Sequence, residues 1–229
     1  MVTTPAAIAA AREPLLGRYS AIEPLDPDRH GSELFAATRE GEGAERIWDY
    51  LPYGPFASEA AFQMWLVERA ASDDPLLFAL RDLQTGRASG MASYLNIHPA
   101  NGSIEIGHIW FGTQLQKTPA ATEALYLMMH HALDALHCRR LEWKCNALNA
   151  GSRRAAVRLG FAFEGIFYQH LIVKGRNRDT AWFAILDHEW PSLRANFETW
   201  LAPANFDSAG KQHASLSALN LAVRRAAPA

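Results

Sequence analysis

Apolar residues recur with a helical period over residues 121–136. They follow the i, i+3, i+4, i+7 template of an amphipathic helix, at Ala121, Ala124, Leu125, Met128, Met129, Ala132, Leu133 and Leu136. The same period predicts further helices at 28–39, 58–71, 152–159 and 188–201. Ser58 is placed to cap the second of these, and Gly160 is placed to end the helix at 152–159.

Between the helices the period changes to two, which is typical of β-strands. The strands that it predicts lie at 15–23, 76–81, 88–97, 103–111, 141–145, 163–173 and 180–186. Turn residues Thr85-Gly86 and Asn101-Gly102 join three of them into a meander, and residues 174–177 form the turn of a last hairpin. Without a linker, repeat or low-complexity tract, this order indicates one α/β (α+β) domain.

Composition and charge exclude several classes of function. With 49% hydrophobic and 20% charged residues, the chain is that of an ordinary folded domain. Its formal net charge of −2 gives no electrostatic case for binding nucleic acid. No apolar run approaches the roughly 18 residues of a membrane span, and no signal peptide is evident at the start. Two cysteines do not make a disulfide framework, so we expect a core position for Cys138 and Cys145 and a cytoplasmic location.

The ends of the chain are expected to lie outside the domain. Residues 1–12 are rich in alanine and threonine and predict a frayed tail, and the domain itself is expected to cover 13–201. Residues 202–229 predict a C-terminal extension. It either adds a short amphipathic helix carrying Leu216, Leu219 and Val223 or hangs loose.

The most informative segment joins the strand at 103–111 to the long helix. Thr118 is placed to cap that helix, and Pro119 occupies its first position. Such a terminus presents free backbone N–H groups and the positive end of the helix dipole, which suits a phosphate or a pyrophosphate, and Lys117 adds a charge. The alternative is a well-capped helix with no ligand.

A second polar segment follows the strand at 141–145. Asn149 and Ser152 stand in the loop before a short helix that ends in Leu159-Gly160-Phe161. Side chains that follow the carboxyl end of a strand commonly face a ligand crevice. The alternative is that this segment only caps the short helix.

Together the two segments resemble the GNAT N-acetyltransferase superfamily, specifically its RimJ/RimL-like branch. The resemblance rests on Glu105–Phe111, Gln116–Ala124, Asn149, Ser152, Leu159–Phe161, Glu164-Gly165, Lys174–Asp179 and the aromatic segment Trp48–Phe56. It implies a mixed, mainly antiparallel sheet, flanked by helices, whose two central strands splay apart. It also implies direct transfer of an acetyl group from acetyl-CoA to a primary amine of an amino acid, small amine or peptide N-terminus.

The resemblance also implies which residues hold acetyl-CoA. These are Trp110, Phe111, Gln116, Lys117, Thr118, Pro119, Ala120, Ala121, Thr122, Asn149, Ser152 and Arg153. Two features depart from the family pattern. The pyrophosphate loop usually follows Arg/Gln-x-x-Gly-x-Gly/Ala, whereas residues 116–121 contain no glycine. The tyrosine that many members use to protonate the leaving thiolate falls at Ala156, which leaves Ser152 as the nearest replacement.

Three residues are candidates for the base that deprotonates the amine. An α-amine with a pKa near 8 needs only a weak base acting through water, and Glu105, His108 and His170 are near the expected site. Strand alternation places Glu105 and His108 on opposite faces, and we favour Glu105, although it could be an exposed strand carboxylate. The acceptor is expected to meet Trp48, Tyr53, Glu105 and His170, and the aromatic residues could equally be core.

Metal binding is not expected, because the spacing of His130, His131 and His137 is not that of a zinc-ligating helix. The alternative function is a non-catalytic acyl-CoA-binding or sensor module on the same fold, suggested by the missing tyrosine and glycines. A more remote one is an interaction protein that uses the apolar helix at 188–201. Whether two copies form a homodimer is left open.

Overall fold

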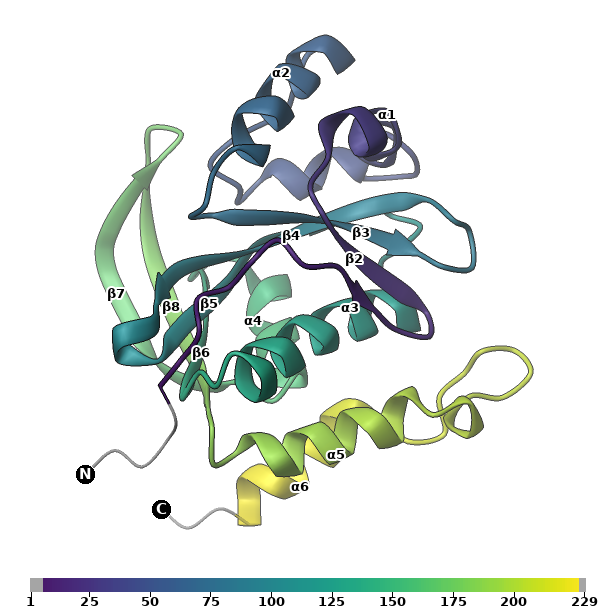
Figure 1. Ribbon diagram of the computed structural model, residues 1–229, viewed down its shortest axis with the longest axis vertical. Helices are drawn as coiled ribbons and strands as arrows, with labels where there is room; N and C mark the ends of the chain where they lie inside the picture. Colours follow the sequence, from purple (N-terminus) through teal and green to yellow (C-terminus); the bar gives the residue numbers. More distant parts are fainter. Residues whose placement is uncertain (1–5, 227–229) are drawn as a thin grey trace.

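One sheet of eight strands organises the protein, in the order β1-β2-β3-β4-β5-β6-β8-β7 (Figure 1). The computed structural model describes residues 6–226. All neighbouring strands are antiparallel except β5 and β6, which are parallel. The strands are β1 (Leu15–Leu16), β2 (Ser20–Pro24), β3 (Leu76–Asp82), β4 (Ala88–His98), β5 (Ser103–Phe111), β6 (Arg140–Asn146), β7 (Ala162–Val173) and β8 (Arg176–Leu186).

The helices confirm the predicted periodicity. They are α1 (Pro27–Ala37), α2 (Glu59–Ala70), α3 (Pro119–His130), α4 (Ala150–Arg158), α5 (Trp190–Leu201) and α6 (Leu216–Ala226). Ser58 caps α2 by accepting the N–H of Ala61, and Gly160 follows α4 with a φ of +97°. The long predicted helix is α3 continued by a π-helical turn over His131–Ala135. The mixed sheet with flanking helices is the predicted fold class.

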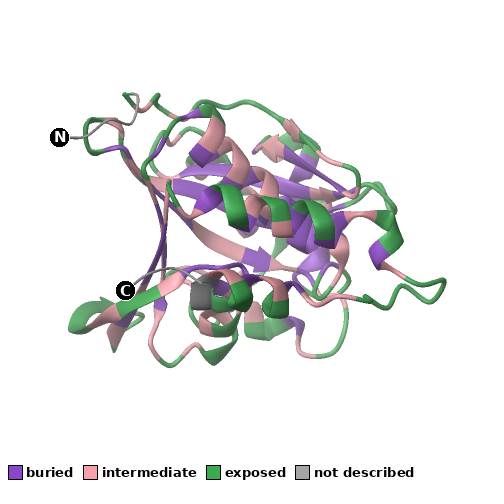
Figure 2. Ribbon diagram, turned by 90° about the horizontal axis from the view of Figure 1, so that it is seen from below, coloured by how far each residue is buried: buried purple, intermediate pink, exposed green. Residues whose placement is uncertain are grey.

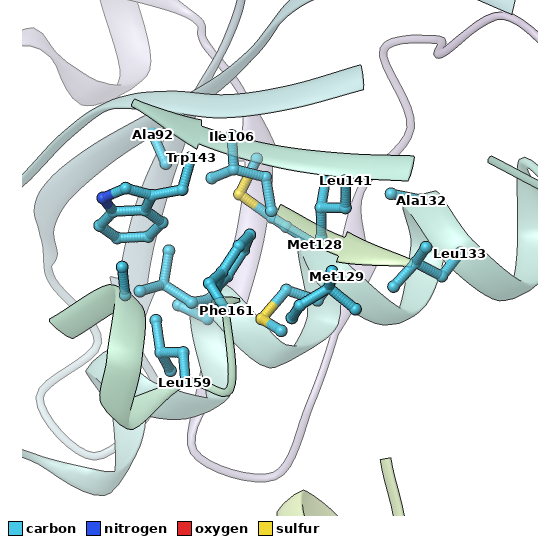
Figure 3. Close-up of a cluster of buried hydrophobic side chains, with 14 of the residues drawn as sticks. Ala92, Ile106, Met128, Met129, Ala132, Leu133, Leu141, Trp143, Leu159 and Phe161 are labelled. Carbon is cyan, nitrogen blue, oxygen red and sulfur yellow. The ribbon is translucent and has the colours of Figure 1, made fainter. Parts of the chain in front are cut away.

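The two faces of the sheet carry separate cores, because alternate residues of each strand point to opposite faces. In β3, Phe78 and Leu80 belong to the core between the sheet and helices α3 and α5, which we call the first core. Leu77 and Ala79 belong to the core between the sheet and helices α1 and α2, which we call the second core. Figure 1 shows these helices on the two sides of the sheet. Purple segments mark the buried strands and the inner sides of the helices (Figure 2). Figure 3 shows the first core, where methionines of α3 meet β6 and the end of α4. We name the α1/α2 side of the sheet the upper face.

Two details differ from the sequence prediction. The predicted first strand is divided into β1 and β2, and Glu123 of α3 accepts hydrogen bonds from the backbone between them. The last hairpin turns over Lys174-Gly175 alone, because both residues adopt positive φ angles, +50° and +72°, as tight primed turns require.

Both ends of the described chain pack on the domain. Of the predicted tail, residues 1–5 lie outside the described residues, whereas Ile8 donates its N–H to Leu136 and Arg12 pairs with Asp73. At the other end α6 forms, and Leu216 is fully buried in the first core. The described helices include none with the length and apolar character needed to cross a bilayer.

Candidate active site

The sheet opens between β5 and β6. The two strands pair only over Ser103–Glu105 and Arg140–Glu142, although β5 continues to Phe111 and β6 to Asn146. Past Glu105 each strand stays paired to its outer neighbour, β5 to β4 and β6 to β8, so the inner edges separate. A separation of this kind leaves backbone N–H and C=O groups available to a ligand. The predicted splay is confirmed.

Helix α3 begins at this opening as predicted. Thr118 caps it by accepting the N–H of Ala121 at 3.1 Å, and Pro119 is its first residue. Lys117 has a φ of +61°, and within the described chain the backbone N–H groups of Lys117 and Thr118 donate no hydrogen bond. Gln116 turns back and donates its side-chain N–H to the carbonyl of Phe111 at 2.9 Å. The start of α3 thus offers donors without glycine.

Helix α4 begins beside the same opening, at the end of β6. Asn149 is its cap and accepts the N–H of Ser152 at 3.0 Å, so the Ser152 side chain is not needed for capping. The Ser152 hydroxyl instead accepts a hydrogen bond from the indole N–H of Trp143 at 3.0 Å and contacts the thiol of Cys145. It therefore lies against β6 on the lower, α3-side face of the sheet. Both cysteines are buried and free, as expected.

The arginines of α4 differ in what they contact. Arg153 donates to the carbonyl of Ala147 at 3.3 Å and lies over the ring of Phe163. Arg158, which the sequence did not single out, donates to the hydroxyl of Thr122 in the first turns of α3 at 3.1 Å. The α4 arginine that contacts α3 is therefore Arg158, and the spacing of α3 and α4 in the sequence gives no sign of it.

Glu105 lies on the upper face, at the last position where β5 pairs with β6. Its side chain is 6% exposed, accepts the amide N–H of Asn96 at 2.7 Å and pairs with the ammonium of Lys144 at 2.8 Å. Burial raises the pKa of Glu105, and the two partners oppose that rise. It is a buried, hydrogen-bonded group and not an exposed strand carboxylate.

His108 corrects the alternation argument. We expected it to face away from Glu105, but β5 bulges here: His108 and Ile109 together stand opposite the single Ala92 of β4, and His108 has a φ of +51°. Because of this bulge the His108 imidazole lies on the upper face. It stacks on Tyr53 there, and its Nδ1 lies 3.3 Å from the Tyr53 hydroxyl. Burial and the charges of Arg69 and Arg178 lower the pKa of His108 to about 4.

The aromatic segment 48–56 spans the open end of the sheet. Tyr50 donates its hydroxyl to the carbonyl of Leu148 before α4, and Lys174 at the hairpin tip donates to the carbonyl of Trp48 at 2.9 Å. The Trp48 side chain itself is 5% exposed and packs with Trp110 in the second core, so Tyr53 is the member of this segment beside His108. Gly54, with φ +63°, is required because a Cβ there would overlap the Trp48 ring.

His170 lies on the β7–β8 hairpin, with its Nδ1 3.0 Å from the Thr180 hydroxyl and its ring near Trp182. Trp182 in turn carries the ammonium of Lys144 over its ring at 4.2 Å. The structure thus places Glu105, Tyr53 and His170 on one face of the sheet. Glu105 and Ser152 lie on opposite faces of the opening.

Several residues at this site were missed by the sequence reasoning, namely Arg69, Asn96, Lys144, Arg158 and Arg178. A period of two places Arg178, Thr180 and Trp182 on one face of β8, so that signal was present. Arg69 follows Trp65 by one helical turn. What the sequence lacked was the strand order β5-β6-β8, which brings them together.

Comparison with known proteins now identifies the family. The family model "Acetyltransferase (GNAT) domain" matches residues 22–162, more than half of the chain. The chain belongs to the GNAT acetyltransferase family. It is therefore an acetyltransferase enzyme of the family that uses acetyl-CoA as co-substrate.

Solved GNAT structures share the fold. A GCN5-related N-acetyltransferase from Brucella melitensis is 49% identical, with 95% of this chain and 97% of that chain covered and a TM-score of 0.91. A "probable acetyltransferase" of the GNAT family from Chromobacterium violaceum is 39% identical, covering 83% and 94%, with a TM-score of 0.76.

A curated relative connects the chain to the RimJ/RimL-like branch. The ribosomal-protein-serine acetyltransferase of Escherichia coli is 34% identical over 80 residues. That match covers 35% of this chain and spans 44% of the relative's length.

Proposed function

We propose that this GNAT enzyme transfers an acetyl group from acetyl-CoA to a primary amine of an amino acid, a small amine or a peptide N-terminus, by direct attack in a ternary complex. The observation that supports this most is the opening between β5 and β6, with the N-termini of α3 and α4 beside it. The residues on its lower face suit the coenzyme, and those on its upper face suit the amine.

The coenzyme-binding residues are proposed from their donors. The unpaired N–H groups of Lys117 and Thr118, together with the start of α3, suit the pyrophosphate, and Arg158 adds a charge near Thr122. The proposal keeps the residues expected from the sequence, namely Gln116–Thr122, Asn149, Ser152 and Arg153, with the backbone of Phe111. The Trp110 side chain belongs to the second core instead.

Acetyl-CoA supplies the activated acetyl group: a bond forms from the amine nitrogen to the acetyl carbon, the carbon–sulfur bond breaks, and the amine gives up a proton. Glu105 is the proposed base, receiving that proton through water. Its raised pKa, held by burial, makes it a stronger base than an exposed carboxylate. An α-amine has a pKa near 8, about one pKa unit above neutral pH, so a weak base is sufficient to remove its proton.

The backbone of β5 is placed to stabilise the charge that develops on the acetyl oxygen. Gly112 donates to Ser89 at 2.7 Å, so the alternation of an antiparallel pair directs Trp110 towards β4 and Phe111 towards the opening. The N–H of Phe111 is the proposed oxyanion donor. On the other face, the Ser152 hydroxyl is proposed to hydrogen-bond to the departing thiolate and to pass it a proton taken up from solvent water, in place of the tyrosine that Ala156 replaces.

A second candidate is a non-catalytic acyl-CoA-binding module on this fold. Ala156 is fully buried, so no tyrosine-like acid can act from that position, and Glu105 is engaged by Lys144 and Asn96. The two candidates differ in turnover and not in binding.

Two free, buried cysteines also support the proposal that the protein works in the reducing cytoplasm.

The test incubates the protein with acetyl-CoA and a panel of amines and follows release of free thiol. We expect turnover on at least one amine, and kcat about 100-fold lower in Glu105→Gln. The matched control is Glu142→Gln, which also removes a carboxylate 2.8 Å from Lys144 but lies on β6 and not on β5. Equal losses in the two variants would reduce Glu105 to a structural partner of Lys144.

The role of Ser152 is tested separately. Ser152→Ala is expected to slow turnover more than it weakens acetyl-CoA binding, because Asn149 continues to cap α4. The thermal shift that acetyl-CoA produces measures the binding. A clear acetyl-CoA shift without turnover on any amine would favour the non-catalytic module.

A further inference from the structure

Four buried hydrogen-bond donors on the upper face have no partner in the described chain, and three of them lie around His108 and the Lys144–Glu105 pair. The Nε atoms of Arg69 and Arg178 and the indole Nε1 of Trp182 are inaccessible to solvent and bond to nothing in the described chain. The fourth such group, Nε1 of Trp110, belongs to the second core. Buried polar groups are nearly always satisfied, and leaving one unpaired costs about 1–3 kcal/mol. All three of these are donors, so the group that would satisfy them is an acceptor.

The guanidinium groups of Arg69 and Arg178 come near His108 from two separate elements, α2 and β8. Arg69 lies on α2 one turn beyond Trp65, whose ring is 4.4 Å from that of Tyr53, and Tyr53 stacks on His108. Arg178 lies on β8 beyond Thr180, which pairs with Asn146 at the very end of β6. Since β6 has ended there, no strand separates Arg178 from β5. The positive charges of both arginines act on His108.

No carboxylate neutralises Arg178 within the described chain. It forms no ion pair, and the nearby Glu105 is already bonded to Lys144 and Asn96. In the described chain the guanidinium of Arg69 forms one ion pair, with its neighbour Glu68 through Nη2 at 2.8 Å, which leaves Nε unused. Burial disfavours the charge of Arg178 and lowers its pKa, so the folded protein tolerates a costly cation here.

We propose that Arg178, assisted by Arg69, binds an anionic group of the acceptor, a carboxylate or a phosphate close to the reacting amine. The inference rests on the proposed function and deepens it by naming the class of acceptor. A planar guanidinium matches both anions with paired, charge-assisted hydrogen bonds. Glu105 and the opening between β5 and β6 lie on the same face, so an anion held by Arg178 places an amine of the same molecule near the proposed base.

The experiment compares acceptors that differ only in the anion. The amino-acid pairs are L-serine with L-serinamide and L-phenylalanine with L-phenylalaninamide, and phosphoethanolamine is paired with ethanolamine. We expect the wild-type protein to prefer the anionic member of at least one pair in kcat/KM. A preference within the amino-acid pairs assigns a carboxylate, and one confined to the last pair assigns a phosphate.

Arg178→Gln is expected to lower kcat/KM for the preferred anionic acceptor about 10- to 100-fold and to leave its neutral counterpart unchanged. The matched control is Arg176→Gln, an exposed arginine on the same strand, which should change neither. Acetyl-CoA should still raise the melting temperature of Arg178→Gln, which shows that the variant is folded. An equal loss on both members of a pair would overturn the proposal, because the arginine would then act on the amine and not on the anion.

A binding measurement keeps this test separate from the test of acetyl transfer. The N-acetylated anionic products are expected to stabilise the wild-type protein more than their neutral counterparts do, and Arg178→Gln should remove the difference. The pairs are the N-acetyl forms of L-phenylalanine and L-phenylalaninamide, of L-serine and L-serinamide, and of phosphoethanolamine and ethanolamine. Turnover on neutral and anionic amines alike would overturn the anion site and leave the proposed function intact. Absence of turnover on every amine would instead count against the proposed function, and the product-binding difference would still decide the anion site.

Discussion

At the scale of single residues, the buried carboxylates of this protein have distinct tasks. Glu105 faces the opening of the sheet, whereas Glu123 in α3 serves the fold. The carboxylate of Glu123 accepts the backbone N–H groups of Arg18, Tyr19 and Ser20, at 2.9, 2.6 and 2.8 Å, and is 5% exposed. It thereby fastens the segment between β1 and β2 to the helix whose N-terminus faces the proposed coenzyme site.

Glu123→Ala is expected to lower the free energy of unfolding by about 3–5 kcal/mol, because it leaves several buried backbone donors without an acceptor. Denaturant unfolding measures the loss. The control is Glu198→Ala on α5, whose side chain is 57% exposed and which should change stability by less than about 0.5 kcal/mol. A loss for Glu123→Ala no larger than that of the control would show that solvent replaces the carboxylate.

At the scale of elements, the hairpin β7–β8 and the segment 48–56 meet although they are far apart in sequence. The contact is made by Lys174, which donates to the carbonyl of Trp48 from the two-residue turn of the hairpin. Tyr50 fastens the same segment to the loop before α4. These two bonds hold Tyr53 over the upper face, next to His108.

Lys174→Met is expected to raise KM for the acceptor amine several-fold with little change in kcat, because it frees the segment that carries Tyr53 without touching the opening of the sheet. Steady-state kinetics with varied amine measures this effect. The thermal shift caused by acetyl-CoA should be unchanged. Lys211→Met, at an exposed lysine of the C-terminal segment, is the control. An unchanged KM in Lys174→Met would show that the segment holds its position without the hairpin.

The elements were predictable from the sequence wherever local signals decide them. Such signals lie within a few residues of the feature that they predict. Examples are the apolar period of α3, its start at Thr118-Pro119 and the Ser58 cap of α2. The bulge at His108 was not predictable, because it depends on the register between β5 and β4. The action of Arg69 and Arg178 on the same histidine was missed for a related reason, since α2 and β8 come near His108 only through the order of the strands.

At the scale of the whole molecule, burial makes several histidines sensitive to acid. Desolvation lowers the pKa of His30, His108 and His131, and for His108 the charges of Arg69 and Arg178 add to it. Each is therefore neutral in the folded protein at a pH where the unfolded chain binds a proton. Because the unfolded state takes up more protons, stability from these groups is present above pH 6.5 and is lost as the pH falls.

For His108 the size of this effect follows from its pKa of about 4 against 6.5 in an unfolded chain. Linkage then predicts that lowering the pH from 7.5 to 5 costs about 2 kcal/mol of stability through this residue alone. His108→Gln should remove that part, so its free energy of unfolding should fall less steeply with pH than that of the wild-type protein.

Denaturant unfolding at pH 7.5, 6 and 5 measures both slopes, and His188→Gln, at a histidine with a side chain 73% exposed, should reproduce the wild-type slope. Arg178→Gln should also flatten the curve, because removing a positive charge that acts on His108 raises the pKa of the imidazole towards 6.5. A slope that neither variant changes would place the imidazole in contact with solvent and the two guanidinium groups too far away to act on it.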